Sequence, residues 1–272
     1  MSRTVARSTA LPVAHRVLIE GYGMAVYLVF LAVFVYFIGF IAGNQLPAFL
    51  ADSFPRTVDS GGPMSSWTMA LTINLGLVLL FAGQHSVMAR QSTKRVLAKI
   101  LPPATERSTY VLLSSICLAA LMFFWHPIPS YVWQMQAPWA QLAMNVGSLC
   151  GWLLVLASTF MISHADLFGL RQVLAAARQR KMPKPKMVTP LVYKLVRHPL
   201  YLGFLLAFWL SPAMTWGHLF FAAAGTGYIF VGIHFEEKDL AREFSGEYLE
   251  YRRRIPMLLP IRSGRRQRIA RR

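Results

Sequence analysis

Hydrophobic residues dominate long stretches of this chain, and charged residues are confined to the segments between them. Four runs contain no Asp, Glu, Lys or Arg: residues 21–51, 60–89, 108–165 and 198–235. Each run exceeds the ~20 residues that an α-helix needs to cross the hydrocarbon core of a bilayer. The pattern therefore predicts an all-α integral membrane protein.

Proline residues divide the longer runs into separate helices, because proline interrupts a helix interior. We expect full spans near residues 22–45, 67–88, 109–126 and 139–163, then two short helices near residues 199–210 and 218–235. The first of these short helices falls below the ~30 Å of the hydrocarbon core at 1.5 Å per residue. The expected fold is a polytopic transmembrane helix bundle of four full spans plus a C-terminal helical hairpin, with a cytosolic amphipathic helix.

Basic residues are concentrated in alternate connections between the spans. Of the 28 Lys and Arg residues, 27 lie in residues 1–19, 89–107, 164–198 and 236–272, and the remaining one is Arg56. By the positive-inside rule, this asymmetry predicts that both termini are cytosolic. Topology and contact with anionic membrane lipids then explain the net charge of +17, so that no nucleic-acid partner is expected.

Composition agrees with a membrane protein, since only 14% of the 272 residues are charged, against ~25% in soluble proteins. We expect one membrane domain over residues 20–260, flanked by basic tails at residues 1–19 and 261–272. Cys117 and Cys150 lie deep in apolar runs. They have no metal-ligand or disulfide spacing, and no metal site is predicted.

Ionisable residues gather where the spans reach the predicted cytosolic boundary. Ionisable groups at membrane depth are functional candidates by default. Four of the seven histidines lie at this level, and two glutamates follow the last of them: His85, His164, His198, His234, Glu236 and Glu237. Their convergence from different spans predicts a shared site.

Several reaction classes lack their sequence motifs. The chain has no Gly-x-Ser-x-Gly nucleophile elbow and no glycine-rich phosphate loop with lysine. No histidine has another within four residues, which argues against a membrane di-iron centre. A haem between two histidines of different spans stays open, and so does a non-catalytic scaffold.

Two motifs bound the predicted hairpin. One opens it, Arg197-His198-Pro199-Leu200-Tyr201-Leu202-Gly203, and the other closes it, Glu236-Glu237 followed by Phe244, Tyr248 and Tyr251. Together they resemble the isoprenylcysteine carboxyl methyltransferase superfamily. The resemblance implies an integral membrane methyltransferase that binds S-adenosylmethionine at the cytosolic face.

Other segments narrow this resemblance. They are Val58-Asp59-Ser60-Gly61, Gln84-His85-Ser86, Glu106-Arg107-Ser108-Thr109-Tyr110, and residues 164–172. These segments are similar to the bacterial methanethiol S-methyltransferase branch, and membrane proteins associated with nitrite reduction share parts of them. The resemblance implies methylation of a small thiol, methanethiol to dimethyl sulfide, in the bacterial inner membrane. A lipid or prenyl-cysteine acceptor stays open.

The donor would need partners for its ribose hydroxyls, adenine and zwitterionic amino-acid end. Carboxylates accept hydrogen bonds from hydroxyl or ammonium groups, and arginine binds carboxylates. Tyrosines offer an aromatic surface, and glycine permits close approach of the backbone. The candidate cofactor-binding residues are Arg197, His198, Tyr201, Gly203, Glu236, Glu237, Tyr248 and Tyr251.

Methyl transfer to a thiol requires removal of the thiol proton, because the thiolate is the nucleophile and a free thiol has a pKa of ~8.5. A neutral histidine can take this proton, and a nearby cation can stabilise the thiolate. His85 and His164 are the candidates for the base or an orienting group, with Arg171 or Arg197 as the cation.

Overall fold

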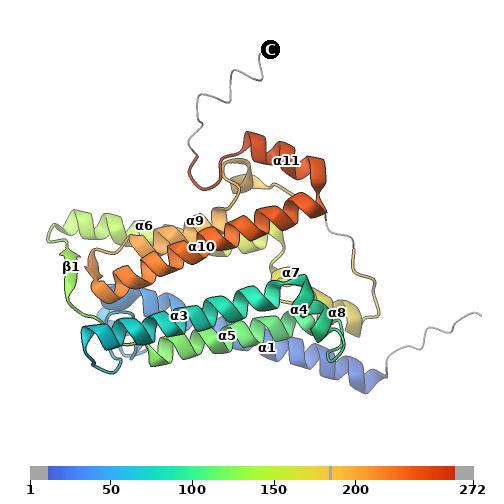
Figure 1. The fold of residues 1–272 in the computed structure, drawn as a ribbon, viewed down its shortest axis with the longest axis horizontal. Helices are drawn as coiled ribbons and strands as arrows, with labels where there is room; N and C mark the ends of the chain where they lie inside the picture. Colours follow the sequence, from blue (N-terminus) through green and yellow to red (C-terminus); the bar gives the residue numbers. More distant parts are fainter. Residues whose placement is uncertain (1–11, 184–185, 261–272) are drawn as a thin grey trace, which may run out of the picture.

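The computed structural model describes residues 12–183 and 186–260. The predicted C-terminal basic tail, residues 261–272, and the first eleven residues of the predicted N-terminal tail lie outside the described residues. The long helices run side by side along one axis of the molecule (Figure 1). The all-α class predicted from the sequence is confirmed.

Five helices of the described residues are long and apolar enough to cross a membrane: α1 Val13–Ala42, α3 Trp67–Ala89, α5 Glu106–Phe124, α6 Pro138–Ile162 and α10 Trp216–Glu243. Four of them correspond to the four predicted full spans. The fifth, α10, has 28 residues, so the expectation of a short second hairpin arm was wrong. The helix continues through Glu236 and Glu237 because charged residues end the apolar run without interrupting the helix.

The first hairpin arm is short, as predicted. Helix α9, Pro199–Trp209, has 11 residues, which corresponds to roughly 16 Å. It runs antiparallel to the later half of α10, where the Trp209 indole donates to the Thr226 hydroxyl at 2.9 Å. The start of α9 therefore lies beside the end of α10.

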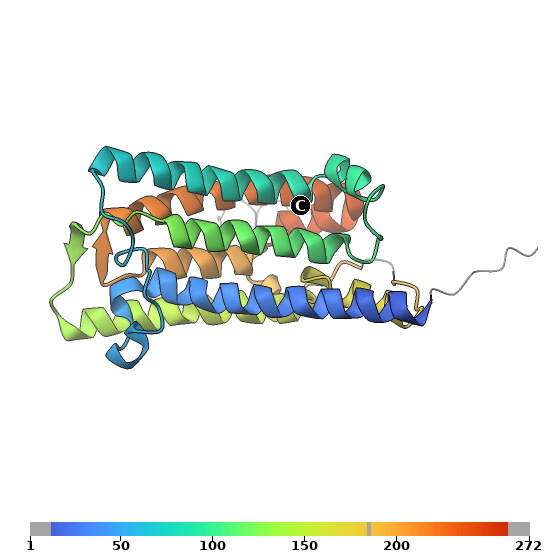
Figure 2. The ribbon, with the colours of Figure 1, turned by 90° about the horizontal axis from the view of Figure 1, so that it is seen from below.

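Helices α6, α9 and α10 form one side of the bundle, and α1, α3 and α5 form the other (Figures 1 and 2). Aromatic side chains fill the space between the two sides. Trp152 meets Phe37 edge to face, with ring centroids 5.7 Å apart, an arrangement that aromatic pairs prefer. The buried aromatic residues of this core are Phe37, Phe40, Trp125, Trp152, Phe208 and Phe221.

Helices α6 and α9 pack through glycines. A Cβ atom on Gly203 would lie 2.6 Å from the Gly151 carbonyl oxygen, and one on Gly151 would lie 2.7 Å from the Gly203 carbonyl oxygen. Small residues permit such close backbone contact between membrane helices. Gly203 was predicted to allow close approach of a ligand, but it faces α6, and this contact explains the glycine without any ligand.

The remaining elements lie at the two ends of the bundle. We call the end where α3 and α10 finish the basic end, and the other the opposite end (Figure 2). Toward the basic end lie α4 Gln91–Leu97, α7 His164–Leu167, α8 Leu170–Ala177, η2 Leu191–Lys194 and α11 Ser245–Arg254; toward the opposite end lie η1 Gly43–Gln45, α2 Ala48–Ala51, β1 Tyr131–Gln134 and β2 Ala213–Thr215. Strands β1 and β2 pair antiparallel. Helix α11 is the predicted helix after the hairpin.

A buried polar cluster fastens the loop after α1 to α10 at the opposite end. The Thr215 hydroxyl donates to the Asp59 carboxylate at 2.6 Å. His218 is fully buried, and its Nδ1 lies 3.9 Å from the Asp59 carboxylate. Each polar group offsets part of the desolvation of the others, so Asp59 of the Val58-Asp59-Ser60-Gly61 motif has a structural role.

Candidate functional site

The carboxylate of Glu237 on α10 lies at the centre of a buried ion-pair network at the basic end. Its Oε1 accepts from Arg197 Nε at 2.9 Å and Nη2 at 2.6 Å, and lies 3.1 Å from His198 Nε2. Its Oε2 lies 3.2 Å from Arg252 Nε. Buried charges need such partners to offset desolvation, and Glu237 finds them within the protein.

The same arginine ties the start of α9 to the segment that follows α11. Arg197 Nη1 donates to the carbonyl oxygens of Arg252 at 3.2 Å and Ile255 at 2.5 Å. The backbone amides of Arg197 and His198 donate to the carbonyl oxygens of Pro256 and Met257. Arg197 and Glu237 were predicted to contact the donor; the structure gives both of them partners within the protein.

Glu236 offers the accessible carboxylate of the predicted pair. Its side chain is 42% exposed, and one carboxylate oxygen lies 4.0 Å from His198 Nδ1. The Tyr201 hydroxyl approaches α10 one turn before Glu236, since it lies 3.5 Å from the position of a Cβ atom on Gly232. His198 therefore lies between the two glutamates, one satisfied by the protein and the other available to a ligand.

His85 on α3 uses both ring nitrogens. Nε2 lies 2.6 Å from the Tyr110 hydroxyl and Nδ1 lies 3.1 Å from the Ser114 hydroxyl. Both partners belong to α5. The Phe81 ring stacks on the imidazole with centroids 5.5 Å apart. These contacts fix the orientation of the His85 ring.

Three tyrosines connect His85 with Glu236, and we call Tyr110, Tyr201 and Tyr228 the tyrosine cluster. The Tyr228 ring lies 6.3 Å from the His85 ring. Tyr228, Gly232 and Glu236 follow one another at four-residue spacing on one face of α10, and the Tyr201 hydroxyl approaches this face at Gly232. Helices α3, α5, α9 and α10 thus bring His85, a predicted base, and Glu236, a residue predicted to bind the methyl donor, to a common half-buried region.

His164, the other predicted base, lies in a different environment. Its Nε2 is 2.7 Å from the Tyr27 hydroxyl on α1, and its Nδ1 is 2.8 Å from the Thr159 hydroxyl on α6. The Phe160 ring stacks on the imidazole at 4.2 Å. Burial lowers the pKa of His164 below its ordinary value, so the ring is neutral near pH 7.

Arg171, the predicted cation, lies on α8 and pairs with a carboxylate of its own segment. Its Nη1 lies 2.6 Å from the Asp166 carboxylate, and its side chain is 45% exposed. The Ser163 hydroxyl donates to the same oxygen at 2.7 Å. Within the described residues, Arg171 therefore pairs with the segment that contains His164 and not with the tyrosine cluster.

The two predicted tyrosines of α11 fasten that helix. Tyr248 is buried, and the Tyr251 hydroxyl donates to the Tyr193 carbonyl oxygen at 2.6 Å. Burial raises the pKa of Tyr251 to about 12. The two rings contribute to packing of α11.

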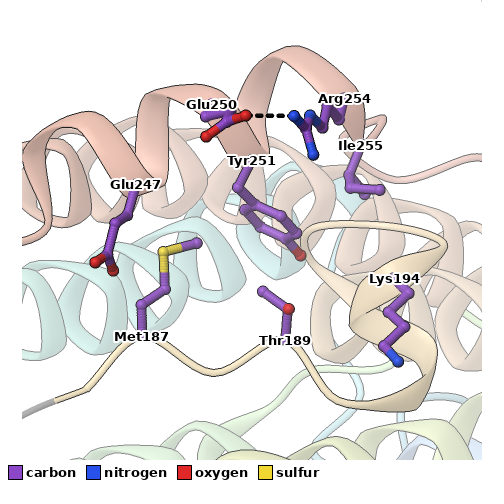
Figure 3. A pocket seen from close by; sticks show the side chains of 8 residues that line it. All are labelled: Met187, Thr189, Lys194, Glu247, Glu250, Tyr251, Arg254 and Ile255. Carbon is purple, nitrogen blue, oxygen red and sulfur yellow. Dashed lines mark hydrogen bonds and ion pairs between the residues drawn. The ribbon is translucent and has the colours of Figure 1, made fainter.

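Tyr251 also faces an open hollow of about 370 Å³ between α11 and the segment before η2. Its ring points into this hollow (Figure 3). The hollow carries both acidic and basic side chains, and its lining consists of Met187, Thr189, Lys194, Glu247, Glu250, Tyr251, Arg254 and Ile255. Sequence patterns did not predict Lys194 or Arg254 here, because the loop and helix meet only in the folded chain.

The fold and this arrangement define a polytopic membrane protein with a charged and aromatic site at its basic end. A family model described as NnrU protein matches residues 73–234. The chain is 50% identical over 246 residues to methanethiol S-methyltransferase 2 of Bradyrhizobium diazoefficiens, covering 90% of this chain and 91% of the relative. It is 46% identical to the methanethiol S-methyltransferase of Mycobacterium tuberculosis, covering 88% and 94%.

A more distant relative is nurim of Sus scrofa, 30% identical over 203 residues that cover 67% of this chain and 76% of the relative. No solved structure matches the chain. The chain belongs to the NnrU family of membrane proteins and, within it, to the methanethiol S-methyltransferases. The methyltransferase resemblance seen in its motifs is confirmed.

Proposed function

We propose that this protein transfers a methyl group from S-adenosylmethionine to methanethiol, forming dimethyl sulfide, at the cytosolic face of the bacterial inner membrane. One observation carries the proposal: the tyrosine cluster borders both the hydrogen-bonded His85 ring and the face of α10 that carries the accessible Glu236 carboxylate. A group able to bind the donor and a group able to take a proton are thereby neighbours. The names of the relatives support this choice of acceptor.

The residues around Glu236 fit the donor. Bound S-adenosylmethionine would supply an electrophilic methyl group on a positive sulfonium. Glu236 can accept a hydrogen bond from a ribose hydroxyl or the ammonium group, and His198 Nδ1 lies 4.0 Å from this carboxylate. Arg197 and Glu237 form a buried ion pair that fixes the start of α9 against α10, and thereby positions the residues around Glu236.

His85 is the proton acceptor best placed relative to Glu236. An alkyl thiol is mostly protonated near neutral pH, and only its thiolate attacks the methyl carbon efficiently. A neutral imidazole can take the proton. Contacts with Ser114 and Phe81 hold the ring, so that little reorganisation is needed when the proton moves.

The orientation follows from the charge distribution, since 27 of the 28 Lys and Arg residues lie on one side of the predicted topology. Donor and site then share the cytosolic side. Reporter fusions at the C-terminus and within residues 46–66 test this orientation. We expect cytosolic activity from the C-terminal fusion only, and a cytosolic signal from residues 46–66 would overturn the topology.

The function is tested by acceptor selection in the purified full chain. Methyl-labelled S-adenosylmethionine is supplied with methanethiol, a longer alkyl thiol, farnesylcysteine or phosphatidylethanolamine. We expect volatile labelled dimethyl sulfide from methanethiol as the dominant product. Label on farnesylcysteine or on the lipid would reassign the acceptor, and a haem Soret band in the pure protein without methylation would favour a redox function.

A further inference from the structure

The His85 imidazole has no free nitrogen to offer to a thiol. Nε2 is 2.6 Å from the Tyr110 hydroxyl, and Nδ1 is 3.1 Å from the Ser114 hydroxyl. With the Nδ1 proton donated to Ser114, Nε2 accepts the phenolic proton of Tyr110. The phenolic oxygen retains the capacity to accept a second hydrogen bond.

Tyr110 is the hydrogen-bond partner of His85 that belongs to the tyrosine cluster. Tyr201 faces α10, where its hydroxyl oxygen lies 3.5 Å from the position of a Cβ atom on Gly232, and Gly232 is one helical turn from both Tyr228 and Glu236. Tyr228 approaches from α10, and its ring lies 6.3 Å from the His85 ring. Because hydroxyl groups occupy both ring nitrogens of His85, a thiol beside the tyrosine cluster reaches the imidazole through the phenolic oxygen of Tyr110.

A fixed positive charge accompanies this tyrosine. The Arg107 guanidinium carbon lies 4.9 Å from the centre of the Tyr110 ring. The Arg107 Nε donates to the Leu167 carbonyl oxygen at 2.8 Å, which holds the group in position. A preorganised cation stabilises negative charge that develops on a nearby oxygen or sulfur.

We propose that Tyr110 contacts the acceptor thiol and passes the thiol proton to His85. This inference rests on the proposed function. The thiol S–H bond breaks and an O–H bond forms on Tyr110, while the original Tyr110 proton moves to Nε2 of His85. The sulfur lone pair then forms the new bond to the methyl carbon, and the bond from that carbon to the donor sulfonium breaks. His85 returns its proton to water after the neutral sulfide has left.

The relay predicts a specific pH dependence for the rate of methyl transfer when the Tyr110 hydroxyl is removed. The groups that face Tyr110 and His85 are Arg107 and Ser114 from α5, Tyr228 from α10, and Tyr201 from α9 with Glu236 behind it. Without the phenolic hydroxyl, the protein depends on thiolate already present in solution. The rate then follows the thiolate fraction, which rises about tenfold per pH unit below the thiol pKa.

The test is Tyr110→Phe in the purified full chain, assayed from pH 6 to pH 10. We expect kcat with methanethiol to fall about 10²–10³-fold at pH 7, within the range of general acid–base catalysis, and to recover as pH rises. Calorimetry with S-adenosylhomocysteine should show a Kd within about twofold of the parent protein. His85→Ala combined with Tyr110→Phe should be no slower than either single variant, because residues that act as a unit are not additive.

Tyr22→Phe is the matched control. The Tyr22 hydroxyl is also bonded to α5, at 2.9 Å from the Thr109 hydroxyl, and its removal should leave kcat and its pH profile unchanged. Parental turnover in Tyr110→Phe, or reduced folded yield with a parental pH profile, would overturn the relay alone. Failure of the unmodified protein to form dimethyl sulfide would overturn the proposed function and the relay together.

Discussion

His85 and His164 have nearly the same immediate partners. In each ring, Nε2 meets a tyrosine hydroxyl, Tyr110 at 2.6 Å or Tyr27 at 2.7 Å. In each ring, Nδ1 meets a serine or threonine hydroxyl, and a phenylalanine stacks on the imidazole. Hydrogen-bond geometry alone therefore does not distinguish a base from a structural histidine.

The surroundings of the two tyrosines differ. Tyr110 bonds His85, whose ring lies 6.3 Å from the Tyr228 ring, and the Arg107 guanidinium lies 4.9 Å from the centre of the Tyr110 ring. Tyr27 packs against Phe30 and Phe168, with ring centroids 6.3 and 6.1 Å away. The first environment has a cation that would stabilise the charge in the proposed proton transfer, whereas the second consists of aromatic packing. The neighbours of the hydrogen-bond partner distinguish the two histidines.

Replacing His85 with alanine should have the largest effect on turnover. Loss of general-base catalysis typically costs about 10²–10⁴-fold, and the variant should regain rate as pH rises from 6 to 10. His164→Ala serves as the matched variant and should keep a parental pH profile. If both variants kept parental rates at pH 7, neither histidine would be the base, and an arginine-stabilised thiolate taken directly from solution would replace this mechanism.

Glu236→Ala tests whether the tyrosine cluster adjoins the donor site. Removal of a charged hydrogen bond should weaken binding of S-adenosylhomocysteine by about 1–3 kcal/mol, as measured by calorimetry. The variant should still fold, because the side chain is 42% exposed. If well-folded Glu236→Ala bound S-adenosylhomocysteine as tightly as the parent, the donor would bind elsewhere. His85 would then have no stronger claim than His164 to be the base.

His164→Ala should act on stability. The variant leaves the half-buried Tyr27 hydroxyl without its imidazole partner, whereas Thr159 keeps its bond to the Leu156 carbonyl oxygen, and an unsatisfied buried polar group costs about 1–3 kcal/mol. Thermal unfolding in detergent should show a lowered Tm, with kcat of the folded fraction within a few-fold of the parent. A normal Tm combined with a hundredfold loss of kcat would reverse the roles assigned to the two histidines.

The smallest expected effect is the pH dependence of stability that His164 contributes. Burial lowers its pKa in the folded protein, whereas the unfolded chain has a pKa of about 6.5. The unfolded chain therefore binds the proton more tightly, and this contribution is present above pH 6.5 and lost as pH falls through the folded pKa. Tm measured from pH 5 to pH 8 should drop less toward low pH in His164→Ala than in the parent; an equal drop would contradict the assignment.

The spans were predictable because the absence of charge in a bilayer is a strong and local signal. The predicted span at residues 67–88 corresponds to α3, and that at residues 139–163 corresponds to α6. The start of α1 and the end of α10 were not predictable from the sequence. Charged residues there end the apolar run that marks the span, but the helix continues through them. Val13 and Glu243 mark these ends.

The site was predictable only in part. The motifs brought Arg197, His198 and Glu237 together correctly as one group, although their contacts are mutual. Tyr110 lies in a segment that resembled the family, but the resemblance gave it no role. Tyr228 had no sequence signal, because its proximity to His85 depends on the packing of α10 beside α3.

The contact between Gly151 and Gly203 limits how far α9, which carries part of the candidate site, can shift relative to α6. The two backbones meet there with no side chain between them. No side chain can therefore change rotamer to let α9 move relative to α6. Tyr201 and His198 lie only two and five residues away on the same rigid element. Since a misplacement of about 1 Å can cost about 10²-fold in rate, the accuracy of the proposed chemistry would depend on a backbone contact between two apolar helices.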